Sequence, residues 1–366
     1  MSRDQALAIW RAGVAAVGGH AAVLEGLENA ARPDRILAVG KAAGDMTRAA
    51  MERFPGVPAL VVTKDGHGEG LPEGARLIES AHPVPDRRSL AGGRALREAV
   101  EGMGDGSHLL LLVSGGASAL AEDLVEGKTL ADLSALNRAL LASGKDITAM
   151  NAERRRISRV KGGGLLSGFG GAGVLTLAIS DVPGDDLDVI GSGIGSAPPK
   201  PAFGYEARIV ASNTIARAAA VAGARRQGLT VLDQQEALHD DLHRLAADWG
   251  PRLRAMPPGV IVLGGEPTVV LPDNPGRGGR NQALALALAR EIAGTTGLSI
   301  VVGGTDGSDG PTGDAGGIVD GATWGPGAAD ALERADAGSY LAGKAALLTT
   351  GPTGTNVMDI LVAVRE

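Results

Sequence analysis

Residues 108–120, HLLLLVSGGASAL, place a fully apolar run directly before a loop of glycine and serine. A run that is apolar throughout, and not only at alternate positions, is typical of a strand buried inside a parallel sheet. Similar runs occur on both sides of it, and stretches with helical periodicity separate many of them. The pattern therefore predicts a doubly wound α/β fold. The runs expected to form its first strands are 35–40, 59–63, 75–80, 108–116 and 173–180, with helices expected at 41–53, 87–102 and 129–143.

A proline-rich segment, SAPPKPAFG at 196–204, interrupts this periodicity. The chain has 366 residues, which exceeds the usual size of one domain. We therefore expect one α/β domain over 1–200 and a second, smaller one over 206–366, with a cleft between them. Beyond the break, strands are expected at 207–212, 229–233, 259–265, 298–304, 346–351 and 359–365, and helices near 213–228, 235–249 and 280–295.

The composition excludes several classes of protein. There is no cysteine, so disulfides, thiolate metal sites and cysteine nucleophiles are excluded. A net charge of −7 argues against a surface that binds nucleic acid. The apolar runs are far too short for a membrane span, and the first residues do not form a secretory signal. We expect a cytoplasmic protein with no nucleic-acid or membrane partner, and the sequence makes no prediction of its oligomeric state.

Several predicted strands end in polar, glycine-rich loops, and ligands of open α/β sheets bind at the carboxyl ends of the strands. The loop at 114–118 can bind an anion through the backbone N–H groups of a following helix, although a plain turn gives the same pattern. Lys41 lies at the first turn of a helix, where a cation opposes the helix dipole unless an anion binds there. A solvated surface lysine is the alternative. The candidates in the loop are Ser114, Gly115, Gly116 and Ser118.

Charged residues cluster in three further places. The segment NAERRRISRVKGGG at 151–164 gathers four arginines and Lys161, and guanidinium groups suit carboxylate and phosphate oxygens. Such a run is usually a solvated helix face, so that alternative stays open. The segment SDVPGDD at 180–186 contains three aspartates, and GRGGRNQ at 276–282 opens a helix with Arg280. Carboxylates beside basic loops fit a polyphosphate site with Mg²⁺, because that ion takes one or two carboxylates plus phosphate oxygens.

The stretch GGTDGSDGPTGDAGG at 303–317 contains Asp306, Asp309 and Asp314. Their spacing does not match the calcium loop of an EF-hand. We expect this stretch to close over an anionic substrate, or to place one carboxylate on Mg²⁺.

Nine motifs follow one another along the chain: GKAAGDM, AHPVPD, SGGASAL, LLASGKDITAMN, SDVPGDD, GGEPTV, GRGGRNQALALA, GGTDGSDGPTGDAGG and TTGPTGTNVMD. In this order they resemble the glycerate 2-kinase family, in which an N-terminal DUF4147 domain is followed by a MOFRL domain. They span nearly the whole chain. The resemblance implies a Rossmann-like, mostly parallel first domain and a smaller, mixed MOFRL-type second domain. It also implies ATP-dependent phosphorylation of D-glycerate at its 2-hydroxyl, which gives 2-phosphoglycerate and needs Mg²⁺.

The same resemblance implies that Lys41 and Arg280 are the catalytic cations. We expect Asp181 or Asp186 to hold Mg²⁺, or to act as the base for the 2-hydroxyl. Asp306 and Asp309 are expected to close the site from the second domain. The candidates for binding substrate or nucleotide are Ser114, Gly115, Gly116, Ser118, Lys161, Glu266, Asn281, Asp306, Asp309, Thr353 and Asn356.

Three alternatives remain at this point. A reductase of hydroxypyruvate or tartronate semialdehyde would need an NAD(P)H site, but no G-x-G-x-x-G follows any predicted strand. A kinase for a related small hydroxy acid would use the same residues. A non-catalytic sensor of sugar acids or nucleotides would bind its ligand without turnover.

Overall fold

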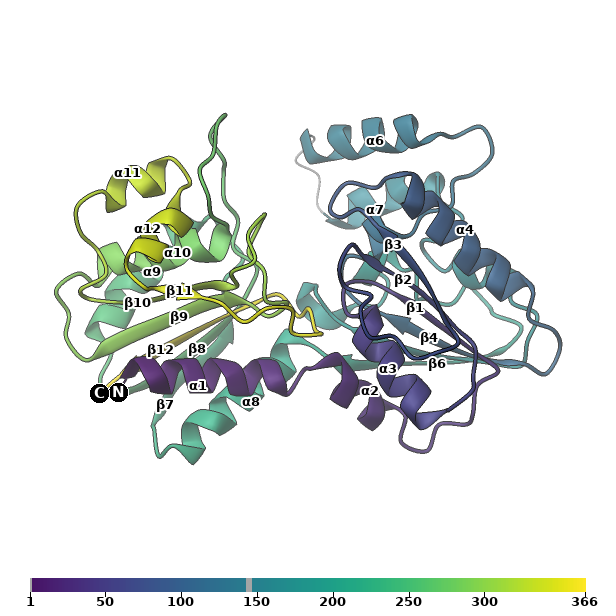
Figure 1. The fold of residues 1–366 in the computed structure, drawn as a ribbon, viewed down its shortest axis with the longest axis horizontal. Helices are drawn as coiled ribbons and strands as arrows, with labels where there is room; N and C mark the ends of the chain where they lie inside the picture. The colour runs from purple at the N-terminus through teal and green to yellow at the C-terminus, as the bar shows by residue number, and fades with distance from the viewer. Residues whose placement is uncertain (1, 143–146) are drawn as a thin grey trace. The chain divides into compact units, whose positions relative to one another are not determined.

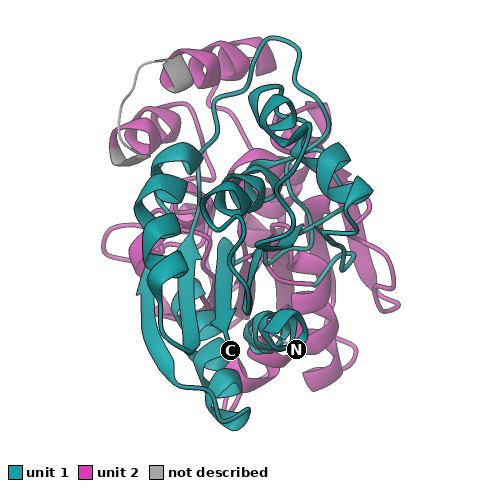
Figure 2. Cartoon of the chain, turned by 90° about the vertical axis from the view of Figure 1, so that its left-hand side faces the viewer, with its two compact units in different colours: residues 1–17, 213–353, 357–366 teal, residues 18–212, 354–356 magenta. Residues whose placement is uncertain are grey.

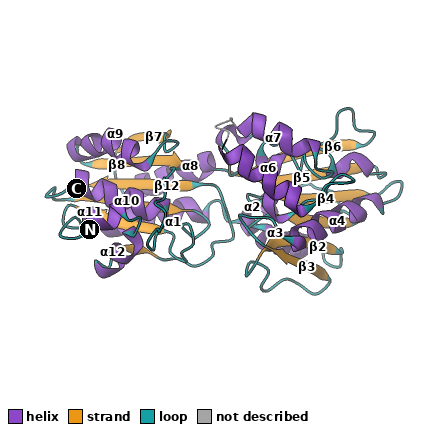
Figure 3. Ribbon diagram, turned by 90° about the horizontal axis from the view of Figure 1, so that it is seen from above, coloured by secondary structure: helices purple, strands orange, loops and turns teal. Residues whose placement is uncertain are grey.

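The computed structural model describes residues 2–142 and 147–366 and forms two compact units (Figures 1 and 2). Each unit combines one sheet with several helices (Figure 3). Unit 2 contains Gly18–Ser212 and Gly354–Asn356. Unit 1 contains the chain up to Val17 together with Asn213–Thr353 and Val357–Glu366. The chain therefore passes between the units four times. Part of the motif LLASGKDITAMN and the expected helix end at 143 lie outside the described residues.

Unit 2 is built on a six-stranded sheet of order β3-β2-β1-β4-β5-β6, and all neighbouring strands are parallel. This confirms the doubly wound parallel sheet. Its apolar strands are buried because helices cover them, and Leu109–Val113 are almost fully buried. The strands are β1 (Arg35–Val39), β2 (Ala59–Lys64), β3 (Ala75–Ser80), β4 (His108–Val113), β5 (Gly173–Ile179) and β6 (Gly204–Ala211). The helices are α2 (Gly19–Gly26), α3 (Ala43–Arg53), α4 (Arg87–Glu101), α5 (Ala117–Leu120), α6 (Leu130–Ala142) and α7 (Ile147–Arg156).

Unit 1 has a mixed six-stranded sheet of order β11-β10-β9-β12-β8-β7. The strand β12 is antiparallel to both of its neighbours, whereas β7 and β8 are parallel. This confirms a mixed α/β second part. The strands are β7 (Val231–Glu236), β8 (Gly259–Gly265), β9 (Leu298–Gly304), β10 (Gly316–Asp320), β11 (Leu347–Leu348) and β12 (Asp359–Arg365). The helices are α1 (Ser2–Ala15), α8 (Asn213–Arg226), α9 (Leu242–Ala255), α10 (Arg280–Glu291), α11 (Ala328–Glu333) and α12 (Ala337–Gly343).

The units differ from the expected ranges 1–200 and 206–366 in two elements. Helix α1 belongs to unit 1, because its apolar side packs against α8, β9 and β12. Strand β6 was expected to open the second part, but it pairs in parallel with β5 and completes the sheet of unit 2. Both differences arise from contacts between distant residues, which the local pattern does not reveal.

Two local predictions in unit 1 were wrong. A helix was expected near 235–249, but β7 continues to Glu236 and α9 begins only after Asp241, whose side chain accepts a hydrogen bond from the His243 N–H (2.9 Å). Strand β10 was not expected, because it opens with two glycines of the stretch interpreted as a loop. The antiparallel hydrogen bonds to β9 hold this segment as a strand, although its glycines have a low propensity for strands.

Among the described residues, no single helix is long and apolar enough to cross a membrane. The bent pair α1 and α2 passes that test on length and composition alone.

Candidate active site

The loops after β1 and β4 meet where the strand order of the unit 2 sheet reverses, which is the usual ligand position in doubly wound folds. The Lys41 N–H donates to the Gly115 carbonyl (2.9 Å), and the Ala42 N–H donates to Ser114 Oγ (3.0 Å). Gly40 has φ 126°, and a Cβ there would lie 2.2 Å from Ser114 Oγ. Only glycine permits this approach, which holds Lys41 at the carboxyl edge of the sheet.

Gly115 lies against two predicted site residues. A Cβ at this position would be 2.2 Å from Asp181 Oδ2 and 2.2 Å from Asn356 Nδ2. The Asn356 amide donates to Asp181 Oδ2 at 3.5 Å. Asn356 reaches unit 2 because Gly354–Asn356 pack there, with the Gly354 carbonyl accepting from the Gly19 N–H (3.0 Å). The structure therefore brings Asp181 and Asn356 together above a glycine that leaves them room.

Gly116 adds a histidine for which no role was predicted. Its φ is 83°, and a Cβ there would lie 3.2 Å from Lys41 Cγ and 3.2 Å from His82 Nε2. His82 belongs to the motif AHPVPD and follows β3, so its place after a strand was the available signal. One loop of unit 2 thus contacts Lys41, His82, Asp181 and Asn356.

The anion site expected at a helix start after this loop has weak support. Helix α5 contains only four residues, too few to build a substantial dipole. Ser114 is buried, and its hydroxyl is already bonded to the Ala42 N–H. Ser118 is half-buried, and its Oγ lies 2.9 Å from Ser192 Oγ. The loop therefore positions neighbouring groups more than it offers a helix dipole.

Lys161 is placed differently from the anion-binding role expected for it. Its ammonium lies 2.5 Å from Glu122 Oε2, and both side chains are almost fully buried. The other oxygen of Glu122 accepts from Ser158 Oγ (2.5 Å) and from the Asp123 N–H (3.0 Å). A buried ion pair of this kind neutralises both charges within the protein. Lys161 therefore does not join the candidate site.

The two aspartates expected to bind Mg²⁺ have different surroundings. Asp181 is half-buried beside Gly115, whereas Asp186 is exposed and accepts from the Asp188 N–H (2.9 Å). Among the described residues, no three His, Asp or Glu side chains surround a common metal position. Mg²⁺ nevertheless needs only one or two protein carboxylates when phosphates supply other ligands. Asp181 alone is therefore enough to serve as the protein carboxylate of a Mg²⁺ site. Asp186 accepts a hydrogen bond within its own turn instead.

In unit 1, Arg280 begins α10 and is held by two carboxylates. Its Nε donates to Asp359 Oδ2 (2.7 Å) and its Nη1 donates to Glu266 Oε1 (2.5 Å). Glu266 follows β8 and Asp359 begins β12, and these strands are antiparallel, so both carboxylates lie at one edge of the sheet. Burial opposes the charge of Arg280, but Asp359 and Glu266 raise its pKa above the usual value. Arg280 therefore stays protonated.

Asp359 was missed in the sequence because it opens an apolar strand, where a charged residue marks only the strand boundary. Its side chain is almost fully buried. Burial raises the pKa of Asp359, and the Arg280 guanidinium opposes that effect. The ion pair with Arg280 is what allows this carboxylate to remain buried.

Asp309 caps a helix, which differs from the expected role of a carboxylate closing over the substrate. Its Oδ1 accepts from the Asn281 N–H (3.1 Å), and its Oδ2 accepts from the Gln282 N–H (2.8 Å). Asp309 and Asn281 are both almost fully buried. Burial raises the pKa of Asp309 to about 7, although the two N–H donors oppose the rise. Asp309 thus fixes the first turn of α10, from which Arg280 projects.

The remaining residues of the 303–317 stretch and the 349–356 loop bind other parts of unit 1. Asp306 Oδ1 accepts from the Ser308 N–H (2.9 Å). Asp314 accepts from Arg277 Nη2 (2.5 Å) and Thr349 Oγ1 (2.6 Å). The Thr353 hydroxyl donates to the Thr305 carbonyl (2.5 Å). Asp306 therefore orders its own turn, and Asp314 connects this stretch with Arg277 and Thr349.

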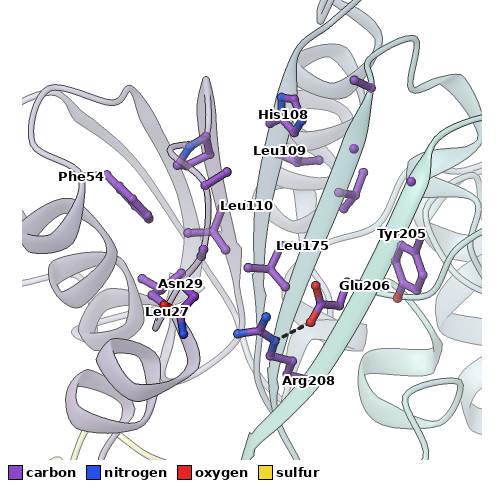
Figure 4. Close-up of a pocket in the computed structure, with 17 residues that line it drawn as sticks. Leu27, Asn29, Phe54, His108, Leu109, Leu110, Leu175, Tyr205, Glu206 and Arg208 are labelled. Atoms are coloured by element: carbon purple, nitrogen blue, oxygen red, sulfur yellow. Dashed lines mark hydrogen bonds and ion pairs between the residues drawn. The ribbon is translucent and has the colours of Figure 1, made fainter.

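A separate cavity of about 420 Å³ opens on unit 2 (Figure 4). It includes His108 and Gly173, which are the first residues of β4 and β5. Its polar wall includes the ion pair between Arg208 Nε and Glu206 Oε1 (2.7 Å). The cavity therefore lies at the amino ends of these strands, away from the loops that carry the candidate residues.

Comparison with known proteins places this fold. The domain of unknown function DUF4147 matches residues 5–222, and the MOFRL family matches 259–359. The D-glycerate 2-kinase of Thermotoga maritima is 34% identical over 381 residues, covering 90% of this chain and 91% of that protein. The crystal structure of glycerate kinase from Thermotoga maritima has a TM-score of 0.89 at 32% identity and covers 100% of this chain and 99% of that chain. A protein of Agrobacterium vitis with a hydroxypyruvate reductase name is 36% identical and covers 89% of this chain and 85% of its own length.

The parallel sheet with polar loops at its carboxyl edge, followed by a mixed sheet, defines an α/β enzyme in two parts. The chain belongs to the glycerate kinase family, in which a DUF4147 domain precedes a MOFRL domain. This confirms the family predicted from the motifs.

Proposed function

We propose that the chain is an ATP-dependent kinase that phosphorylates the 2-hydroxyl of D-glycerate and forms 2-phosphoglycerate. The observation that carries the proposal is the group of Lys41, Asp181 and Asn356 around the glycine loop at the reversal of strand order. The kinase names of the relatives support the same activity.

In this proposal the 2-hydroxyl oxygen attacks the γ-phosphorus of ATP, and the bond to the bridging oxygen of ADP breaks. The hydroxyl proton passes to the carboxylate of Asp181. Lys41 stabilises the negative charge on the phosphoryl oxygens, because phosphoryl transfer depends mainly on positioning and electrostatics. Asn356 donates to Asp181 and so orients its carboxylate.

Mg²⁺ is the cofactor expected for this reaction. As an alternative to its role as proton acceptor, Asp181 would be the carboxylate that binds the ion. When bound, the ion neutralises charge on the phosphate oxygens. Asp181 cannot serve as both a metal ligand and the proton acceptor without a change in its basicity. The dependence of the Asp181→Asn variant on Mg²⁺ concentration separates the two roles.

Arg280 is the second cation of the proposal. Its guanidinium has five N–H donors, and three of its nitrogens already bond to Asp359 or Glu266. The two carboxylates fix its plane, and the remaining donors are available to phosphate oxygens. We assign Arg280 to the charge that develops on the phosphoryl group.

The test is a coupled assay of the purified protein with D-glycerate, ATP and Mg²⁺, with identification of the phosphoglycerate that forms. Formation of 2-phosphoglycerate supports the proposal. Formation of the 3-isomer contradicts the assigned regiochemistry. Oxidation of NADH or NADPH by hydroxypyruvate, without phosphoryl transfer, would establish the reductase alternative instead.

A further inference from the structure

The basic cluster at 151–164 divides by the partners of its side chains. Arg156 is exposed and pairs with Glu153 (2.8 Å). Lys161 is buried and pairs with Glu122. Arg155 donates to the Asp188 carbonyl (2.6 Å) and lies against Gly162. Arg156 and Lys161 thus pair with carboxylates of the protein, and Arg155 donates to a backbone carbonyl.

Arg154 differs from Arg156 and Lys161. It is half-buried, and the groups it contacts are neutral amides. Its Nε donates to Asn137 Oδ1 (3.3 Å), and its Nη1 donates to Asn151 Oδ1 (3.4 Å). Within the described parts of the chain, no carboxylate lies at ion-pair distance from its guanidinium. Burial lowers the pKa of Arg154, and the more distant charge of Glu122 only partly offsets this. A guanidinium in such surroundings is stabilised by a bound anion.

A chain of polar contacts connects Arg154 with the loop after β4. Asn151 Oδ1 also accepts from Ser192 Oγ (3.0 Å), and Ser192 Oγ lies 2.9 Å from Ser118 Oγ. Ser118 follows Gly116 by two residues, and Gly116 lies against Lys41. All of these residues belong to unit 2. Arg154 is thus connected to the loop on which the proposed chemistry depends.

We propose that Arg154 binds the carboxylate of the 2-hydroxycarboxylate substrate. The inference rests on the proposed function, because it assigns the second end of the same substrate. In a 2-hydroxycarboxylate the carboxylate is bonded to the carbon that carries the reacting hydroxyl. Its binding group must therefore lie next to the phosphoryl-transfer residues, and the contacts through Asn151, Ser192 and Ser118 connect Arg154 with their loop.

The test compares D-glycerate with D-glyceramide, which has the same hydroxyls but no carboxylate. Arg154→Gln should raise KM for D-glycerate by about 10- to 100-fold, because the variant loses a charge-assisted hydrogen bond. KM for ATP and kcat/KM for glyceramide should change less than threefold. Arg156→Gln is the matched control, since it removes an exposed arginine of the same helix and should leave KM for D-glycerate unchanged. Equal losses with both substrates, or an unchanged KM for D-glycerate, would overturn the assignment.

Two further measurements keep this test independent of folding and of catalysis. If Arg154→Gln is poorly folded, Arg154→Lys provides the second variant. Because lysine keeps the positive charge, Arg154→Lys should retain part of the affinity for D-glycerate. Calorimetric titration of D-glycerate without ATP measures carboxylate binding directly. A wild-type protein that binds D-glycerate but forms no phosphoglycerate would contradict the kinase proposal alone. Binding that Arg154→Gln leaves intact would contradict the role of Arg154 alone.

Discussion

Replacing Gly115 with alanine tests the proposed site with a single methyl group. The added Cβ would lie 2.2 Å from both Asp181 Oδ2 and Asn356 Nδ2, whereas ordinary contacts begin near 3.4 Å. Each polar group must therefore retreat by about 1 Å, and a misplacement of that size can lower a rate by about 10²-fold. Both atoms are ends of side chains that can rotate, so the cost in folding free energy should be modest, about 1–3 kcal/mol. We expect kcat to fall by about 100-fold while the protein stays folded.

The assay is steady-state kinetics with D-glycerate and ATP, together with a thermal melt of each variant. Gly104→Ala is the control, because a Cβ at Gly104 meets no atom within 4 Å and its φ is not in the left-handed range. The control should retain wild-type kcat. If Gly115→Ala retains kcat within threefold of wild type, Asp181 and Asn356 do not act where the structure places them. If Gly115→Ala unfolds, its activity carries no information. The loss of kcat is then measured with the milder Asn356→Ala variant.

Three further changes test the surroundings of the site. Arg280→Ala should lower kcat by about 10³-fold, the scale of arginines that stabilise a transferring phosphoryl group, and a loss below tenfold would remove it from that role. Asp309 has a folded pKa of about 7 against a usual value of 3.8, so its protonated form favours folding and its contribution to stability declines as the pH rises from about 4 through 7. Asp309→Asn should flatten that part of the pH profile of urea unfolding, and an unchanged slope would contradict the assignment. Lys161→Met leaves the charge of Glu122 buried and should destabilise unit 2 by about 3–5 kcal/mol in denaturant unfolding, and adding Glu122→Gln should restore much of the loss.

The sequence predicted the elements whose signal is local. The strands β1 and β4 were found because their residues are apolar throughout, which burial on both faces of a sheet requires. Strand β6 carries several exposed side chains, and only its pairing with β5 assigns it to unit 2. The unit to which α1 belongs is likewise decided by distant strands.

The sequence predicted which residues belong to the candidate site, but it did not predict which side chains contact each other there. Lys41 and Asp181 follow strands, so the rule for carboxyl ends selects them. The sequence does not reveal that Lys161 faces a buried Glu122, or that Asp309 reaches back to the start of a helix near Asn281. Such assignments depend on which residues meet in space, and burial decides whether a charge serves a ligand or the fold.

The short return of Gly354–Asn356 to unit 2 affects how the protein can be divided. A fragment ending at residue 222, where the match to the first family domain stops, would contain Asp181 but not Asn356. Swapping the second half for that of a relative would bring along a residue that completes the first half. A substitution at Asn356 therefore affects the environment of Asp181 in the first half. A cut at the boundary between the two family domains would separate these two residues.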